Sequence, residues 1–302
     1  MSQATGSAAG FRGLLRIATR GSAQAKAQAT AVAKALMQCH DGLLAELVLV
    51  ETLGDKRADV PLHTMGGQGV FVKEVQRAVL NGDADVAVHS AKDLPSANNP
   101  QLQIAAFCAR RDPRDALVGA ALVDLVPGAT VATGSVRRSA ELANVRPDLQ
   151  FTELRGNIHT RLSKVPVGGA LVMAVAALQI VELTDLIAEY LPVDPFVPSP
   201  GQGCVAVECR TSDEWVAGIL AGIDDPKSRA DVQAERAFLA ALGTGCSLPV
   251  GGYADGSELI GFLARPEIGR ALIRRVALPE GAAALAVAAG LARELHDELH
   301  GS

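Results

Sequence analysis

Four short polar segments of the sequence combine residue types that bind anions. They are RIATRGS (16–22), AVHSAKDLP (87–95), ATGSVRR (132–138) and ELRGNIHTR (153–161). The last two each contain two arginines and precede a predicted helix, and both guanidinium groups and helix N-termini favour anionic groups. One such arginine alone is most simply a solvated surface charge. Four such segments together predict a binding site for a ligand that carries several anions.

Asp93 differs from the cations of these segments. Asp93 follows Lys92 directly after the alternating strand pattern of residues 84–88. A carboxylate that neighbouring cations keep ionised can oppose positive charge that develops on a substrate. The structural alternative is an aspartate that caps the turn before Pro95, a common arrangement.

One cysteine differs in context from the rest. The five cysteines are Cys39, Cys108, Cys204, Cys209 and Cys246. An odd number with no CxxC spacing indicates a reducing, cytoplasmic location, with neither a disulfide framework nor a zinc knuckle. Cys246 lies in the glycine-flanked loop GTGCSLP, whereas three others fall in apolar strand patterns. A thiol in an exposed loop can act as a nucleophile or an attachment point, although most cysteines are inert.

Alternating strands and helices must position the polar segments. Strands are predicted at 14–19, 47–50, 84–88, 130–133, 151–154, 170–175 and 204–209, and helices after Ser22, over 71–79, from Ser135 and from Asn157. The continuous apolar strands favour parallel sheets that are covered on both faces. In open α/β sheets, ligands bind outside the carboxyl ends of the strands, which is where the four segments fall.

The last third of the chain follows a different pattern. Residues 191–203 contain four prolines and a GQG turn, which indicates a loop. Beyond residue 226 the sequence predicts a helix, three strands near 250, 259–263 and 271–277, and a final helix from about residue 280. Two α/β units are therefore followed by a small α+β unit.

The composition narrows the class of protein. The 302 residues are enough for two or three domains, and 49% apolar with 20% charged residues indicates a globular chain. The net charge is −5, from 28 basic and 33 acidic residues, and aromatic residues make up only 3%. We therefore expect neither nucleic acid nor a membrane surface as a partner.

Several other features are expected to be absent. The N-terminal segment lacks the pattern of a secretory signal, and the apolar stretches are shorter than the roughly 20 residues that span a bilayer. The HDEL sequence at 296–299 is followed by three residues, so it is not a retention signal. His296 and His300 lie four residues apart but lack the accompanying glutamate of a zinc motif, so no metal site is expected.

Eight segments in collinear order resemble the porphobilinogen deaminase (hydroxymethylbilane synthase) family. They are RIATR (16–20), VHSAKDLP (88–95), RDPRDAL (111–117), SVRR (135–138), LRGNIHTRL (154–162), PGQG (200–203), AERAF (234–238) and GCSLPVGGYA (245–254). Each segment alone is weak, whereas eight in the same order over almost the whole chain are highly specific.

The resemblance implies an α/β fold with two lobes like those of type II periplasmic binding proteins, followed by a small α+β C-terminal domain. The active site is expected in the cleft between the lobes. The expected boundaries are 1–110 with 201–223 for domain 1, 111–200 for domain 2 and 224–302 for domain 3. The first lobe takes back a strand after the GQG turn, so the chain crosses between the lobes near Arg111 and Val197.

The resemblance also implies the reaction, which joins porphobilinogen units head to tail into hydroxymethylbilane and releases ammonia at each step. Asp93 is then the catalytic carboxylate, and Cys246 holds a dipyrromethane cofactor through a thioether. The side chains expected to bind the carboxylates of cofactor and substrate are Arg20, Ser22, Ser90, Lys92, Ser135, Arg137, Arg138, Arg155 and Arg161. A monomer that needs only porphobilinogen as its partner is expected.

Three positions depart from the family pattern. Gln68 replaces the lysine of a GGKG loop, Ile180 stands where many members have an arginine, and Leu53 interrupts a TRGD sequence. The first two changes remove cations from the cleft, which concerns affinity for the growing chain rather than chemistry at Asp93. They leave two alternatives open: a paralogue that acts on a related pyrrole, and a bilobal protein that only binds a dicarboxylate.

Overall fold

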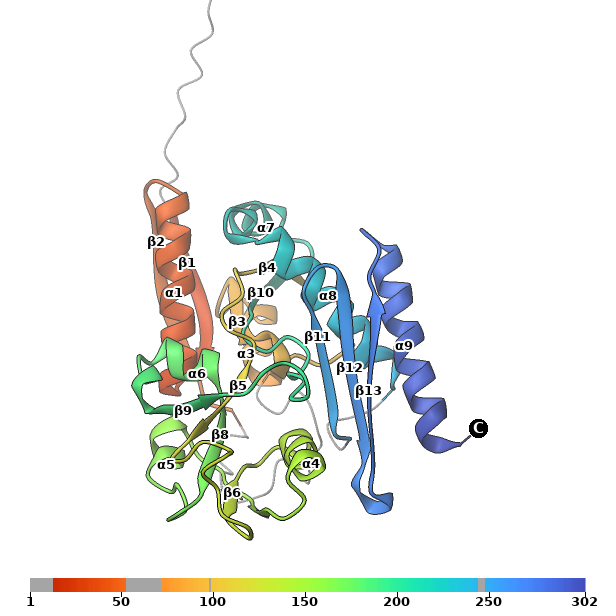
Figure 1. Ribbon diagram of the computed structural model, residues 1–302. Coiled ribbons are helices and arrows are strands. Elements are labelled where there is room, and N and C mark those ends of the chain that lie inside the picture. Colours follow the sequence, from red (N-terminus) through yellow and green to blue (C-terminus); the bar gives the residue numbers. More distant parts are fainter. Residues whose placement is uncertain (1–12, 53–71, 98, 244–247, 302) are drawn as a thin grey trace, which may run out of the picture.

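The computed structural model describes residues 13–52, 72–97, 99–243 and 248–301. These residues form three sheets with helices packed around them (Figure 1). The strand orders are β2-β1-β3-β10-β4, β7-β6-β8-β5-β9 and β11-β12-β13. The mixed α/β fold of two sheet-based lobes and a small C-terminal sheet domain is therefore confirmed.

The first sheet contains β1 (Gly13–Arg20), β2 (Leu43–Val50), β3 (Val86–Ser90), β4 (Leu102–Phe107) and β10 (Val205–Arg210). Strand β1 pairs in parallel with β2 and β3, whereas β10 lies antiparallel between β3 and β4. The predicted return of a strand after the GQG turn is confirmed. The predicted parallel pairing holds for β1 with β2 and β3 but not for β10, because an apolar run that is buried on both faces does not reveal its direction.

The helices of this lobe are α1 (Ala23–Cys39), α3 (Lys73–Leu80) and α7 (Glu214–Leu220). Helix α1 begins at Ser22, whose Oγ accepts a hydrogen bond from the Ala25 amide at 3.3 Å. One face of α1 packs on the sheet through residues three or four positions apart, namely Ala29, Val32 and Leu36 against Leu15 and Ile17.

The second sheet contains β5 (Asp115–Val118), β6 (Thr130–Ala132), β7 (Gln150–Thr152), β8 (Ala170–Ala174) and β9 (Ile187–Tyr190). Strand β6 is parallel to β7 and β8, and β5 is antiparallel to β8 and β9. The helices of this lobe are α4 (Val136–Val145), α5 (Ile158–Leu162) and α6 (Val175–Ile180). Each of them follows directly after one of the parallel strands β6, β7 and β8.

The third sheet contains β11 (Val250–Ala254), β12 (Glu258–Arg265) and β13 (Arg270–Ala277), and it is all antiparallel. It is accompanied by α8 (Pro226–Ala241) and α9 (Ala283–His300), which run side by side at the C-terminal end of the molecule (Figure 1). Short 3-10 turns occupy Ala91–Asp93, Thr184–Leu186, Ala221–Ile223 and Pro266–Ile268.

Strand β12 is buried on both faces. Leu259 and Leu263 point into the core beneath α8 and α9, and the alternate residues Ile260 and Phe262 pack against Val197. The period of two places these two sets on opposite faces of the strand. The C-terminal sheet therefore packs against the segment that joins the two lobes.

The two segments that cross between the lobes lie side by side. The Arg111 amide donates to the Gly203 carbonyl at 2.9 Å, and the Leu191 amide donates to the Asp115 carbonyl at 2.9 Å. These contacts agree with the crossings predicted near Arg111 and Val197, while the exact domain boundaries stay a prediction. No helix within the described ranges has both the length and the apolar character needed to span a bilayer.

Candidate functional site

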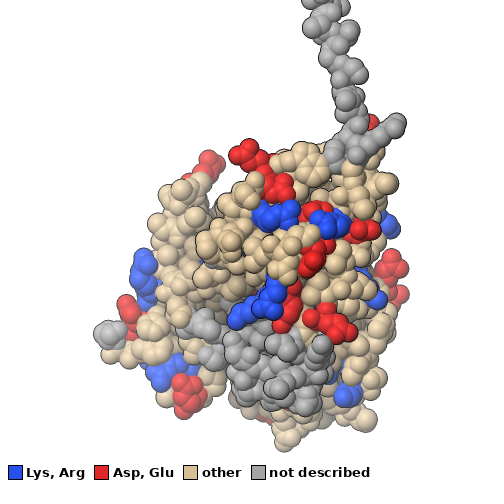
Figure 2. All heavy atoms as spheres, turned by 180° about the vertical axis from the view of Figure 1, so that it is seen from behind, with Lys and Arg blue, Asp and Glu red and all other residues tan. Residues whose placement is uncertain are grey.

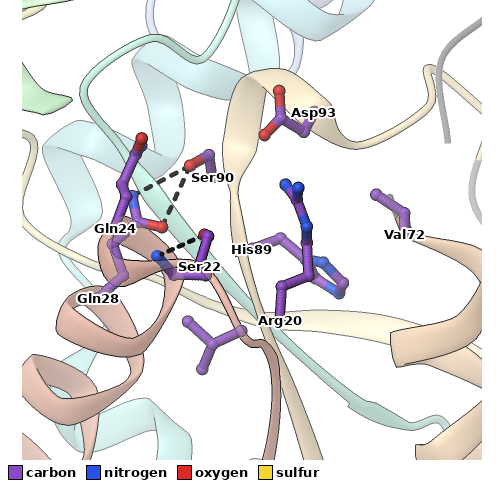
Figure 3. Close-up of a pocket in the computed structure, with 10 residues that line it drawn as sticks. Arg20, Ser22, Gln24, Gln28, Val72, His89, Ser90 and Asp93 are labelled. Atoms are coloured by element: carbon purple, nitrogen blue, oxygen red, sulfur yellow. Dashed lines mark hydrogen bonds between the residues drawn. The ribbon is translucent and has the colours of Figure 1, made fainter. Parts of the chain in front are cut away.

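One wall of the candidate site lies at the carboxyl ends of β1 and β3. A hollow of about 60 Å³ opens there, lined by Arg20, Ser22, Gln24, Ala25, Gln28, Val72, Val88, His89, Ser90 and Asp93. Parallel pairing of β1 with β3 brings the two strand ends to the same edge of the sheet. In Figure 3, Arg20 extends from the end of β1 toward Asp93 on the turn that follows β3.

The turn that carries Asp93 is fixed from several sides. The Ala91 amide donates to the Cys204 carbonyl at 2.9 Å, which ties the turn to the start of β10. The Ser90 hydroxyl exchanges hydrogen bonds with the Gln28 side chain on α1 at 3.0 and 3.2 Å. Ser22 lies beside it and uses its hydroxyl to cap α1. The Asp93 carboxylate is thus presented at a defined place in the hollow.

The opposite wall comes from the second lobe. Ser135 caps α4 by accepting from the Arg138 amide at 3.4 Å, and Asn157 caps α5 by accepting from the Thr160 amide at 3.0 Å. The Nε of Arg161 donates to the Gly156 carbonyl at 2.8 Å, which folds this side chain back over the β7–α5 turn. The SVRR and LRGNIHTR segments therefore open α4 and α5, as the sequence predicts.

Charged side chains from the two lobes interact electrostatically across the site. Burial lowers the pKa of Arg161, and the guanidinium groups of Arg138, Arg155 and Arg20 lower it further, while Asp93 opposes them. Arg20 and Asp93 belong to the first lobe, and the other three belong to the second. The four polar segments that are separate in the sequence therefore converge on one cleft, where cations outnumber Asp93.

Lys92 shares this positive surrounding. Burial is the main reason why its pKa falls to about 8, and Arg138 lowers it further against the opposing effects of Asp93 and Asp115. Its Nζ donates to Oε1 of Gln202 at 3.1 Å. Because its ammonium group is partly destabilised, an anionic ligand that approaches it would regain electrostatic energy.

Two arginines of the second lobe are held by internal carboxylates. Asp115 accepts from Arg138 Nη2 at 2.6 Å and from Arg137 Nη2 at 2.7 Å, and Arg137 Nη1 donates to Glu141 at 2.7 Å and to the Val197 carbonyl at 2.8 Å. Burial opposes ionisation of Asp115, but the two guanidinium groups outweigh it and hold its pKa well below the usual range. Both terminal nitrogens of Arg137 thus bind protein groups, and its predicted contact with a ligand stays a prediction.

Sequence reasoning missed the partners Asp115, Glu141 and Gln202. The sequence carried some signal for each of them: Asp115 lies in RDPRDAL, Glu141 follows Arg137 by four residues, and Gln202 is the central residue of PGQG. Their pairings depend on which strands and crossings meet in space, and this is not evident from the spacing alone.

Some donors in the cleft have no protein acceptor. Within the described residues, Arg155 Nη1 and Arg138 Nε are buried and have no hydrogen-bond partner. Leaving a buried donor unpaired costs about 1–3 kcal/mol, and more for a charged group. The cleft is therefore suited to a ligand whose carboxylates reach these nitrogens.

Cys246 lies outside the described residues, as do Gln68 and Leu53. The segment that contains Cys246 joins α8 to β11. The middle of β11 lies against the second crossing, because the Gly252 amide donates to the Pro198 carbonyl at 2.8 Å. Ile180 is described, and it is half-buried at the end of α6.

Known proteins match this chain over most of its length. The family model "Porphobilinogen deaminase, dipyromethane cofactor binding domain" matches residues 15–218, and "Porphobilinogen deaminase, C-terminal domain" matches residues 230–298. The porphobilinogen deaminase of Acidothermus cellulolyticus is 50% identical over 247 residues, covering 79% of this chain and 74% of the relative. That of Syntrophotalea carbinolica is 42% identical over 290 residues, covering 93% and 92%.

A further relative and one solved structure complete the comparison. The porphobilinogen deaminase of Roseiflexus castenholzii is 44% identical over 257 residues, covering 83% of this chain and 85% of the relative. The structure of the methionine binding protein MetQ superposes with a TM-score of 0.44 at 13% identity, covering 76% of this chain and 94% of MetQ. From the two family models and these relatives we conclude that the chain belongs to the porphobilinogen deaminase family.

Proposed function

We propose that this chain carries out the reaction of its family: it condenses porphobilinogen head to tail into the linear tetrapyrrole hydroxymethylbilane. The observation that carries the proposal is the convergence of Asp93 with cations from four strand-end segments of two lobes. The chemistry of porphobilinogen requires these two features, a carboxylate near a developing cation and several counterions for carboxylates.

Each condensation exchanges one bond for another. The C–N bond of the aminomethyl group breaks and ammonia leaves, a C–C bond forms between the resulting methylene and the free carbon of the next pyrrole, and that carbon loses its proton. Loss of ammonia leaves a resonance-stabilised azafulvenium cation on the substrate. Asp93 stabilises this cation near the pyrrole N–H and assists the proton movements, because an ionised carboxylate opposes the positive charge.

The cations bind the acetate and propionate groups of each pyrrole. We assign this role to Arg20, Lys92, Arg137, Arg138, Arg155 and Arg161, with the hydroxyl groups of Ser22, Ser90 and Ser135 as neutral partners. Support comes from the buried Arg155 Nη1, which lacks an acceptor within the described residues, and from the lowered pKa of Lys92 and Arg161. In this protein, Ser22 and Ser135 also cap helices, so they would hold a carboxylate beside a helix N-terminus.

The same residues fit a dipyrromethane cofactor. Such a group carries the acetate and propionate of two pyrroles, and the second lobe supplies buried cationic donors that have no acceptor among the described residues, such as Arg155 Nη1. When bound, the cofactor supplies a free pyrrole carbon from which the product chain grows. We propose that Cys246 holds it through a thioether. In support, GCSLPVGGYA leads into β11, which packs on the crossing next to the PGQG turn.

The direct test is product analysis with porphobilinogen as the only substrate. We expect one ammonia released for each porphobilinogen consumed, and a linear tetrapyrrole as the product. A protein that only binds dicarboxylates would release ammonia from no pyrrole, whereas a paralogue would leave porphobilinogen unchanged and release ammonia once a related pyrrole is supplied instead. We expect a cytoplasmic location and a monomeric active form, and sedimentation of the purified protein would test the monomer.

A further inference from the structure

Gln202 lies where the two lobes and the third domain meet. It is the central residue of the PGQG turn, and only 1% of it is exposed. Its backbone carbonyl accepts from Arg110 Nε at 2.9 Å, and Arg110 in turn pairs with the buried Glu235 of α8 at 2.6 Å. The turn is therefore anchored to the third domain as well as to the crossing between the lobes.

The side-chain amide of Gln202 connects the two walls of the cleft. Its Oε1 accepts from Lys92 Nζ of the first lobe at 3.1 Å, and Arg138 Nη2 of the second lobe lies 3.5 Å away. Its Nε2 donates to Asp115 Oδ1 at 2.7 Å and to the Pro113 carbonyl at 2.8 Å. The oxygen thus faces cations while the nitrogen faces acceptors, so the reversed orientation of the amide would place donors against donors.

The two glycines beside Gln202 make this placement possible. A Cβ on Gly201 would lie 3.0 Å from the Lys92 amide nitrogen, and one on Gly203 would lie 2.7 Å from the Arg111 carbonyl oxygen. Both glycines also have positive φ, at 76° and 88°. The turn can therefore fit between the backbone before Asp93 and the first crossing, which brings the Gln202 amide to Lys92.

We propose that Gln202 is a positioning residue of the site: its amide holds the Lys92 ammonium group and the Asp115 carboxylate at a fixed separation across the junction of the lobes. The proposal rests on the proposed function, because it assumes that Lys92 beside Asp93 binds ligand carboxylates. Only an amide satisfies both sides. A carboxylate in its place would lack the donor for Asp115, and an apolar side chain would leave Lys92 and Asp115 without this partner.

The ionisation of Lys92 offers a readout of this contact. The charged groups that act on it are Arg138 and Arg137 of α4, Asp115 of β5 and the adjacent Asp93. Burial and the two cations disfavour the ammonium form, the two carboxylates favour it, and the hydrogen bond to the neutral Gln202 acceptor also favours it. Removing this acceptor should lower the pKa of Lys92, and a negative charge in its place should raise it.

The test compares Gln202→Met with Gln202→Glu in the full-length protein. Trace acetylation as a function of pH, read by peptide mass spectrometry, reports the titration of Lys92 without any need for turnover. We expect the midpoint to fall by about one pH unit in Gln202→Met and to rise by a similar amount in Gln202→Glu, since one pH unit corresponds to a tenfold change in the ionisation equilibrium. Gln101→Met, an exposed glutamine of the same lobe, is the matched control and should leave the midpoint unchanged.

Activity gives a second readout. In the same proteins, we expect the alkaline limb of the pH profile of turnover to move in the two directions in which the Lys92 midpoint moves. Midpoints that stay at the wild-type value in both variants, or that move in the same direction, would overturn the proposal. Loss of folded protein in both variants would also overturn it, because Gln202 would then serve the fold. If wild-type protein does not consume porphobilinogen, the proposed function fails while the labelling result still decides the role of Gln202.

Discussion

Asp93 is the residue on which the proposed chemistry depends most. Replacing it by asparagine keeps its size and hydrogen-bonding capacity but removes the charge that opposes the substrate cation. We expect Asp93→Asn to lower turnover by roughly a hundredfold or more while the fold persists. The measurement is porphobilinogen consumption, with Asp41→Asn on the exposed turn before β2 as the matched control. Turnover within a fewfold of wild type in Asp93→Asn would exclude this role.

Replacing Arg155 should weaken ligand binding without lowering the stability of the unloaded protein. Its buried Nη1 has no acceptor within the described residues, so none of these residues gains a hydrogen bond from that nitrogen. We expect Arg155→Leu to reduce the fraction of protein that carries a cofactor several-fold without lowering the thermal stability of the unloaded protein. Intact mass and a melting curve measure the two quantities, and the exposed Arg270→Leu is the control. A loss of stability with unchanged loading would contradict the assignment.

A site residue could be identified from the sequence only where it lies in a recognisable motif and its side chain suits the expected chemistry. Lys92, Asp93 and Arg155 lie at the strand ends where ligands bind in such sheets, and the structure brings them to one cleft. Asp115 and Gln202 could not be assigned in the same way. Each acts through a partner more than 20 positions away in the chain, so their function arises from tertiary contacts.

Helix α4 contributes side chains both to the cleft and to the buried interior of its lobe. It carries Arg137 and Arg138 on the same side as Glu141, and burial raises the pKa of Glu141 to about 8, with Asp115 adding to the increase and Arg137 opposing it. Between the unfolded pKa near 4.5 and this value, the unfolded state is ionised while the folded state keeps the proton. Stability therefore falls as pH rises through this window.

Glu141→Gln removes this titration while keeping an acceptor for Arg137. We expect the variant to gain stability relative to wild type at pH 8 and not at pH 5, by roughly 2–4 °C in the melting midpoint for each kcal/mol involved. Melting curves at the two pH values provide the measurement. An equal difference between variant and wild type at both values would mean that Glu141 is ionised in the folded protein throughout.

The regular elements were predicted where periodicity is strong. Strands β1, β3, β6 and β8 and helices α1, α4, α8 and α9 were expected close to where they lie. Strands β5 and β9 and helices α6 and α7 were not expected, and of β4 only the apolar strand pattern that includes Cys108 was noted. The short strands β5 and β9 each include an acidic residue, Asp115 and Glu189, which interrupts the apolar pattern. The direction of a strand could not be predicted from the sequence either, since β5 and β10 run antiparallel to their neighbours in sheets whose other strands are parallel to one another.

The protein as a whole has a net charge of −5, yet its cleft is basic. On the face in Figure 2, acidic and basic side chains are interspersed, with no broad area of one sign. The cations that we assign to an anionic ligand belong to the polar segments that converge on the cleft. Each added pyrrole brings two more carboxylates, so the demand for counterions grows as the product chain lengthens.

Restoring cations at Gln68 and Ile180, two positions that depart from the family pattern, tests whether the cleft lacks counterions for the longer product chains. We expect Gln68→Lys with Ile180→Arg to shift the bound intermediates at limiting porphobilinogen, with fewer of the longest ones accumulating than in the parent protein. Each charge-assisted contact is worth about 1.5–3 kcal/mol if desolvated and much less if water screens it. Mass spectrometry of the enzyme-bound species is the measurement. An unchanged distribution would mean that other residues already supply the charge.

The most direct test of the account is the intact mass of the full-length protein before and after a limiting amount of porphobilinogen is added. For protein from a host that makes porphobilinogen, we expect a mass above that of the sequence by two linked pyrrole units, then a ladder of single-pyrrole additions. Cys246→Ser should show neither the adduct nor the ladder. Wild-type protein at its bare sequence mass with no ladder, or an adduct that persists in Cys246→Ser, would contradict the account.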